Sequence, residues 1–285
     1  MSRPQRSPFV EFVFAVVLVS FAAPATAQQL LTGDVEAGLG YADNLNLAII
    51  REDEVGAGLL FGSGLLMASA TSRRLEVGAE LGLSGSRYQD YGDLSAVRAH
   101  ARIGVRRELL WGGWAEVYGL GALKDYGDPA RDAQDLAGGI AMGQRLTSLL
   151  AWRIEYRYLD HDAESDTFDY EEHRGSVFAV VGPAKADVVA GYRLAFSQSA
   201  LYMTLEESRT PRGRGQQRQI SSNSFGENQI AYRDDTHSHI GLVRLRYRPL
   251  RWLRLNVSYE IAAIVASDGT AKTQEVSTSL RIIFR

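Results

Sequence analysis

Apolar and polar residues alternate with a period of two along almost the whole chain after residue 27. The pattern is clearest over residues 97–106, where Val, Ala and Ile hold the odd positions and Arg, His and Gly the even ones. Side chains of a strand point alternately to its two faces, whereas a helix would spread these apolar residues around its surface. The sequence therefore predicts an all-β chain whose strands each have one apolar and one polar face.

Twelve segments carry this alternation. They begin near Asp34, Glu54, Leu75, Ala96, Trp114, Asp135, Leu150, His173, Asp187, His237, Trp252 and Lys272. The sixth, eighth and tenth are the weakest, and the sixth is rich in Gly and Ala with little polar contrast. Many segments run to ten residues or more. Strands of soluble proteins have about 5–6 residues, and a strand that crosses a bilayer needs about 9–11.

The connections between these segments also alternate in length. After the even-numbered segments they are short and turn-like, around residues 71–73, 109–113, 147–148, 182–184 and 249–250. After most odd-numbered segments they are longer and polar, with the longest at 199–236 and only the last, 267–271, short. This asymmetry is typical of a single antiparallel up-and-down transmembrane β-barrel with short periplasmic turns and long extracellular loops. An even strand number places both ends of the barrel domain on the short-turn side.

The aromatic residues are sorted by strand end. All four tryptophans lie beside short turns: Trp111, Trp114, Trp152 and Trp252. Tyrosines gather toward the long loops: Tyr41, Tyr88, Tyr91, Tyr126 and Tyr158. Two aromatic girdles at opposite interfaces are expected of a membrane barrel, and this sorting by strand end fits them.

Composition excludes several other classes of protein. The mean hydropathy is slightly negative, which argues against a bundle of apolar membrane helices, and the net charge of −3 argues against a nucleic-acid binder. The absence of Cys excludes disulfides and thiolate metal sites. A soluble exported β-sandwich stays open as an alternative because it shows the same alternation with the faces reversed. Charges along the middle of the polar faces favour the membrane barrel.

The first 27 residues have the pattern of a secretory signal peptide. Arg3 and Arg6 precede an apolar stretch over residues 9–23, and Ala25-Thr26-Ala27 offers small residues at the −3 and −1 positions of a cleavage site. We therefore predict an exported protein with a signal peptide at 1–27 and a barrel domain at 28–285.

Two short segments resemble those of Gram-negative outer-membrane barrels. Leu280-Arg281-Ile282-Ile283-Phe284 closes the final strand and resembles the C-terminal signal read by the barrel-assembly machinery, with Leu280, Ile282 and Phe284 as the assembly signal, although Arg285 follows the aromatic residue here. Residues 40–46 (GYADNLN) resemble the first strand and loop of porin-like barrels, some of them linked to surface-polymer export. The resemblance implies location in the cell outer membrane and contact with its lipid and lipopolysaccharide, without naming a substrate or a cofactor.

The charged residues of the polar faces would point into the lumen of such a barrel. The predicted lumen charge network comprises Glu36, Glu76, Glu80, Arg98, Arg102, Arg106, Arg153, Glu155, Arg157, Arg244, Arg246, Arg254, Glu260 and Arg281. Closure would bring Arg281 beside Glu36 or Asp34, and Arg98 and Arg102 are expected to meet Glu76 and Glu80 on the neighbouring strand. Twelve strands lie between barrels of about 8, whose interiors are filled, and those of about 16–18, which hold open pores. The network either sets the selectivity of a channel or fills a narrow barrel.

Other clusters predict no catalytic or metal site. In His237-Ser238-His239, neighbouring residues on a strand would point to opposite faces, so we expect no Ser–His pair. The acidic stretch 160–172 matches no EF-hand spacing and is expected to be a solvated loop. Arginines of the longest loop would contact lipopolysaccharide or fold into the lumen: Arg209, Arg212, Arg214 and Arg218. The leading hypothesis is a non-enzymatic channel or structural barrel, and the alternative is a lipid-active outer-membrane enzyme.

Overall fold

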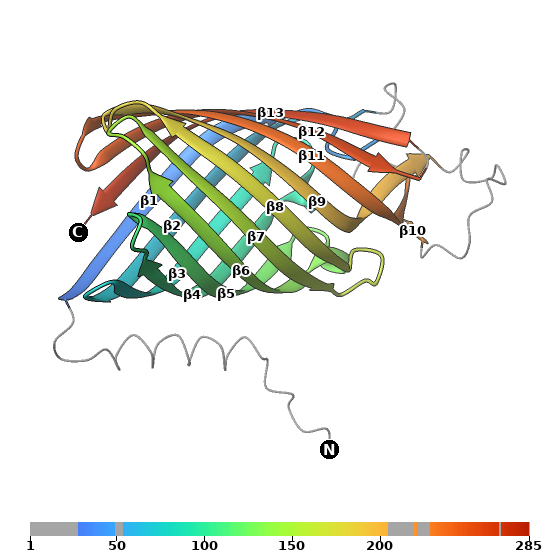
Figure 1. Cartoon of the computed structure of the whole chain (residues 1–285). Helices are drawn as coiled ribbons and strands as arrows, with labels where there is room; N and C mark the ends of the chain where they lie inside the picture. Colours follow the sequence, from blue (N-terminus) through green and yellow to red (C-terminus); the bar gives the residue numbers. More distant parts are fainter. Residues whose placement is uncertain (1–27, 49–53, 205–218, 222–228, 268, 285) are drawn as a thin grey trace, which may run out of the picture.

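Twelve long strands form one closed antiparallel barrel with strongly tilted strands (Figure 1). The computed structural model describes residues 28–48, 54–204, 219–221, 229–267 and 269–284. The long strands are β1 (Gln28–Ala42), β2 (Ala57–Ser72), β3 (Leu75–Tyr88), β4 (Ala96–Glu108), β5 (Gly113–Tyr126), β6 (Ala133–Arg145), β7 (Leu150–Ala163), β8 (Tyr170–Val181), β9 (Ala186–Thr204), β11 (Gln229–Leu250), β12 (Leu253–Ala266) and β13 (Gly269–Phe284). A three-residue strand, β10 (Gln219–Ser221), pairs with the start of β11.

Each long strand pairs with the next one along the chain, and β13 pairs with β1 to close the ring. The predicted up-and-down barrel with short turns at one end and long loops at the other is therefore confirmed. The longest strands are β9 with 19 residues and β11 with 22. In the described part of the chain, no helix is long and apolar enough to cross a membrane. The predicted signal peptide and the four arginines of the longest loop lie outside the described residues.

The strands turn their apolar faces outward. Large apolar side chains are exposed on every side of the barrel, for example Leu83 at 58%, Val117 at 63% and Val257 at 51%. Charged side chains instead reach across an intervening strand to bond with each other, as Arg193 of β9 does with Glu260 of β12. Side chains converge in this way only on the concave side of a barrel. The polar faces therefore point inward, as in a membrane barrel and unlike a soluble sandwich.

This assignment of faces predicts different outcomes at two neighbouring positions of β12. Val257→Arg places a charge in lipid and should lower the free energy of unfolding by up to about 2–4 kcal/mol, depending on its depth in the bilayer. Ser258 points inward and its Oγ lies 2.7 Å from that of Ser277, so Ser258→Arg is the matched control and should cost far less. Folding yield into lipid vesicles measures both variants, and equal losses would contradict the assignment.

One tryptophan does not join the girdle expected at the short-turn end. Trp111 stacks on Trp152 with ring centroids 6.4 Å apart, and Trp252 is exposed, so these three lie on the outside. Trp114 was predicted with them, but it lies on the inner face of β5, where the guanidinium of Arg106 covers its ring at 4.3 Å. The direction of the Trp114 side chain follows from its place in the alternation of β5 and not from its closeness to a turn.

The seam between the first and last strands is closely packed. Gly33 of β1 lies opposite Phe284 of β13, and a side chain at Gly33 would collide with the Phe284 ring. Leu280, Ile282 and Phe284 are all exposed on the outer face of β13. Recognition of these three residues by the assembly machinery stays a prediction.

Candidate functional site

Ion pairs lie around the whole inner face of the barrel. Arg281 spans the β1–β13 seam, where its Nε and Nη2 donate to Asp34 at 2.8 and 2.7 Å. Glu36 lies 4.0 Å from Arg281 and accepts hydrogen bonds from Asn256 and Ser279. Further pairs are Arg153–Glu155 at 2.6 Å, Arg157–Glu172 at 3.0 Å, Arg174–Glu172 at 2.6 Å, Arg193–Glu260 at 3.2 Å and Arg246–Asp187 at 2.5 Å. These pairs occupy part of the lumen.

The most buried of these groups surrounds Asp135 of β6, whose side chain is only 3% exposed. Its carboxylate lies 2.6 Å from Nδ1 of His161, 3.1 Å from Nζ of Lys124 and 3.9 Å from Nη2 of Arg98. The His161 ring in turn stacks on Tyr170 at 4.4 Å. One carboxylate therefore joins three strands, β4, β5 and β7, through their inward side chains.

The expected pairing of Arg98 and Arg102 with Glu76 and Glu80 is wrong, because none of the four side chains forms an ion pair with another of them. The β3–β4 register sets Glu76 opposite Arg106 and Glu80 opposite Arg102. Arg102 nevertheless pairs with Glu116 on its other side, and Glu80 accepts from His100 Nε2 at 3.1 Å. Arg98 turns instead to Asp135. The hairpin register and the reach of the side chains decide the partners, and neither can be read from alternation alone.

Four predicted network residues make no ion pair with any other described residue: Glu76, Arg106, Arg244 and Arg254. Arg106 is held over Trp114, whereas Arg244 is exposed although it points inward. Nε of Arg254 is buried without a hydrogen-bond partner. Space and positive charge therefore remain inside the barrel.

Sequence reasoning missed several members of the network, and one of them, Asp135, lies on the strand with the least polar contrast, β6. The missed residues include Glu116, Lys124, Asp135, His161 and Glu172. Small inner residues on β6 let β5 side chains pass over it: Tyr118 crosses Gly139 and donates to Glu155 of β7. The outward Leu136 and Ile140, at 61% and 54% exposure, were the available signal, since their spacing turns Asp135 inward.

The loops of the long-loop end meet over the opening in a structure that we call the outer cap. Its buried apolar centre consists of Leu94, Phe168, Tyr202 and Ala231, with Leu45, Val55, Tyr91 and Ala130 packed around them. These residues come from the loops after β1, β3, β5 and β7 and from the ends of β9 and β11. Loops from so many points of the ring can meet only by crossing its opening, so the outer cap covers that end of the lumen.

Hydrogen bonds link the loops of the outer cap in series. The bonds between loops are Gly127 N–Ser95 O at 2.9 Å, Asp128 N–Asp93 O at 3.1 Å, Glu164 N–Asp132 O at 2.8 Å and Ser165 N–Ala130 O at 3.1 Å. Arg131, in the short 3-10 turn η3 (Pro129–Arg131), lies 4.7 Å over the ring of Phe168. In the first loop, the buried Asn44 side chain donates to the carbonyl oxygens of Ala48 and Lys272 at 3.0 and 2.8 Å. The cap is thus an ordered part of the fold.

Cavities remain inside the barrel between side chains of the described strands and loops. One of about 280 Å³ lies beneath the outer cap and is lined by residues that include Tyr126, Arg131, His161 and Ser238. One of about 350 Å³ lies along β1 to β5, beside Glu76, Glu80 and Arg102. A third, of about 220 Å³, lies near the short turns. The lumen is narrow, yet it is not filled.

The His-Ser cluster and the acidic stretch form no reactive centre in the structure. Ser238 points inward, whereas His237 and His239 point outward, where His239 Nδ1 lies 2.6 Å from the Tyr192 hydroxyl. Asp160 and Asp162 are exposed on the outer side of β7, and Glu172 faces the lumen. Among the described residues, no three His, Asp or Glu side chains are grouped so that they could hold a metal ion.

Comparison with known proteins supports the fold. No family model and no curated protein sequence matches this chain. An outer membrane channel from Pseudomonas putida F1 matches its structure with a TM-score of 0.56 at 13% identity, over 92% of this chain and 97% of that one. A NanC porin matches with a TM-score of 0.50 at 9% identity, over 87% and 98% of the two chains. The chain therefore has the fold of porin-like outer-membrane barrels.

Proposed function

We propose that this barrel is a narrow, non-enzymatic channel that favours small anions and is closed at its extracellular end by the outer cap. The observation that carries the proposal is the inner face itself, which holds charged side chains around the ring and still leaves cavities along it. Charged side chains lining a narrow pore select ions by their sign. An apolar closure at one end prevents water and ions from crossing until the loops separate.

Uncompensated charge on the inner face of the strands is positive by a small margin. Five inward arginines have no carboxylate among the described residues within 4 Å: Arg106, Arg145, Arg244, Arg248 and Arg254. Four strand carboxylates of the inner face also have no ion pair with a described residue: Glu76, Glu108, Asp234 and Glu275. The small excess of positive charge supports a preference for anions.

Arg244 provides the test of selectivity because it points inward, is exposed and has no carboxylate partner among the described residues. In a potassium chloride gradient, Arg244→Glu should shift the reversal potential toward the equilibrium potential of potassium. Arg107→Glu makes the same change of charge on the outer face of β4 and is the control. Planar bilayer recordings measure both variants. A wild-type barrel that favours cations, or equal shifts in the two variants, would contradict an anion-selective lumen.

Export of a surface polymer is the second candidate, and residues 40–46 favour it. Within that segment, Asn44 fixes the first loop inside the extracellular mouth, so this loop would have to move before a polymer could pass. Block of the current by an acidic oligosaccharide, but not by a neutral one of equal length, would support this role. Block by neither oligosaccharide would argue against polymer export and leave the small-anion channel as the remaining candidate.

A further inference from the structure

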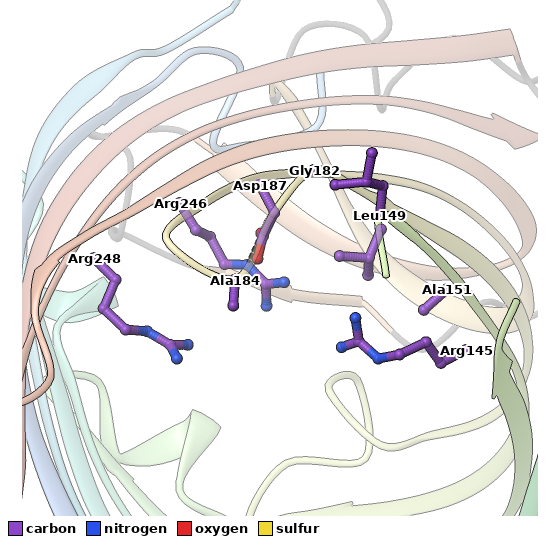
Figure 2. Close-up of a pocket in the computed structure, with 9 residues that line it drawn as sticks. Arg145, Leu149, Ala151, Gly182, Ala184, Asp187, Arg246 and Arg248 are labelled. Carbon is purple, nitrogen blue, oxygen red and sulfur yellow. Dashed lines mark hydrogen bonds and ion pairs between the residues drawn. The ribbon is translucent and has the colours of Figure 1, made fainter. Parts of the chain in front are cut away.

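We infer that the periplasmic end of the lumen holds a binding site for a multivalent oxyanion, formed by Arg145, Arg246 and Arg248 (Figure 2). The inference deepens the proposed channel function and rests on it. It names both the ligand chemistry, carboxylate or phosphate groups carrying at least two charges in all, and the end of the barrel from which the ligand enters.

The three arginines come from two parts of the barrel wall. Arg145 ends β6, whereas Arg246 and Arg248 lie near the end of β11. The wall between them is lined by small residues, Ala151, Val180, Gly182 and Ala184, and this leaves a cavity of about 220 Å³. In Figure 2 the guanidinium groups of Arg145 and Arg248 extend from opposite sides into this space.

The site has more positive charge than its own residues neutralise. Asp187 accepts from Nε of Arg246 at 2.5 Å and is the carboxylate that lines the cavity. Arg145 donates to the carbonyl oxygen of Ser148 at 3.2 Å, which cancels no charge. Nε of Arg248 is buried without a hydrogen-bond partner, and a buried donor in that state is costly. An anion between Arg145 and Arg248 would neutralise two charges.

The chemistry of guanidinium selects an oxyanion over chloride. Its planar donors match two oxygen atoms of one carboxylate or phosphate group, and such paired bonds are the stronger ones. Two guanidinium groups on opposite sides of a cavity can each hold a separate oxygen edge of one ligand. A monovalent ion neutralises only one of the two charges, so the site should retain multivalent oxyanions while chloride passes.

Planar bilayer recordings in potassium chloride test the site with two probes, inorganic phosphate and citrate, added in turn to either side. We expect both probes to reduce the chloride current, and to do so at lower concentration from the side of the short turns. Block by phosphate alone, or by citrate alone, would identify the class of oxyanion that the site takes. The double variant Arg145→Gln with Arg248→Gln should raise the half-blocking concentration by about tenfold or more.

The control is Arg74→Gln, which removes an exposed arginine from the β2–β3 turn at the same end of the barrel, outside the cavity. It should leave the block unchanged. If the double variant has the same half-blocking concentration as the wild type, the inference is overturned.

Calorimetric titration of the detergent-solubilised protein with each probe separates failure of the site from failure of the channel. Binding that depends on Arg145 and Arg248 in a protein that carries no current would support the site and reject the proposed channel. A conducting protein that binds neither probe would reject the site and leave the channel standing.

Discussion

Replacing Leu94 and Phe168 together by alanine should raise the conductance of the barrel several-fold. Both side chains are buried at the centre of the outer cap, where loops from around the ring meet. Loss of a buried Leu costs about 2–5 kcal/mol and loss of a buried Phe about 3–5 kcal/mol. Their contacts hold loops that are otherwise joined by a few hydrogen bonds, so the cap should open while the strands stay paired. Single-channel recordings measure the change.

Leu110→Ala with Leu146→Ala is the control for the cap variant. These leucines are exposed at 89% and 53% in the short turns, at the opposite end of the barrel. The control should conduct like the wild type, and circular dichroism should show that both double variants keep their strand content. If the cap variant keeps its strands and conducts no better than the wild type, the outer cap does not limit the current.

Asp135→Ala should destabilise the barrel more than any other loss of a single lumen carboxylate. The Asp135 side chain is 3% exposed and is close to His161, Lys124 and Arg98. Removing one partner of a buried ion pair leaves the other charge uncompensated, which costs about 3–5 kcal/mol. Urea unfolding of the protein in vesicles, followed by tryptophan fluorescence, measures the loss.

Asp160→Ala controls for the loss of a carboxylate. Asp160 of β7 lies opposite Leu136, the neighbour of Asp135 on β6, but its side chain is exposed on the outer side. Its effect should stay within about 0.5 kcal/mol. Adding Lys124→Met to Asp135→Ala should recover part of the stability, since it removes a charge that the first change left unpaired. An Asp135 variant as stable as the Asp160 variant would mean that the buried cluster does not hold β4, β5, β6 and β7 together.

The stability and conductance experiments address different layers of the same barrel. The Asp135 cluster joins strands below the outer cap, whereas Leu94 and Phe168 join loops above them. We expect the cap variant to change conductance with little effect on strand pairing. The Asp135 variant should show the converse, a large loss of stability without opening of the cap.

The sequence by itself determined the strands, the apolar and the polar face of each, and which connections are short turns and which are long loops. Alternation is a local property, because neighbouring residues of a strand always point to opposite faces, and Val257 and Ser258 could therefore be assigned to opposite faces from spacing alone. The asymmetry of the connections was equally local. Even in the weak segment of β6, outward Leu136 and Ile140 held the information that turns Asp135 into the lumen.

Only the tertiary structure decided which inward side chains meet. Register set Glu80 opposite Arg102, but Arg102 bonds to Glu116 on its other side, and the small residues of β6 let Tyr118 cross a whole strand to Glu155. The outer cap depends on the same kind of long-range information, since Leu94 and Phe168 are far apart in the chain and meet only when the ring has closed. Strand faces follow from the geometry of one chain segment, whereas ion pairs and loop contacts follow from the curvature and closure of the whole sheet.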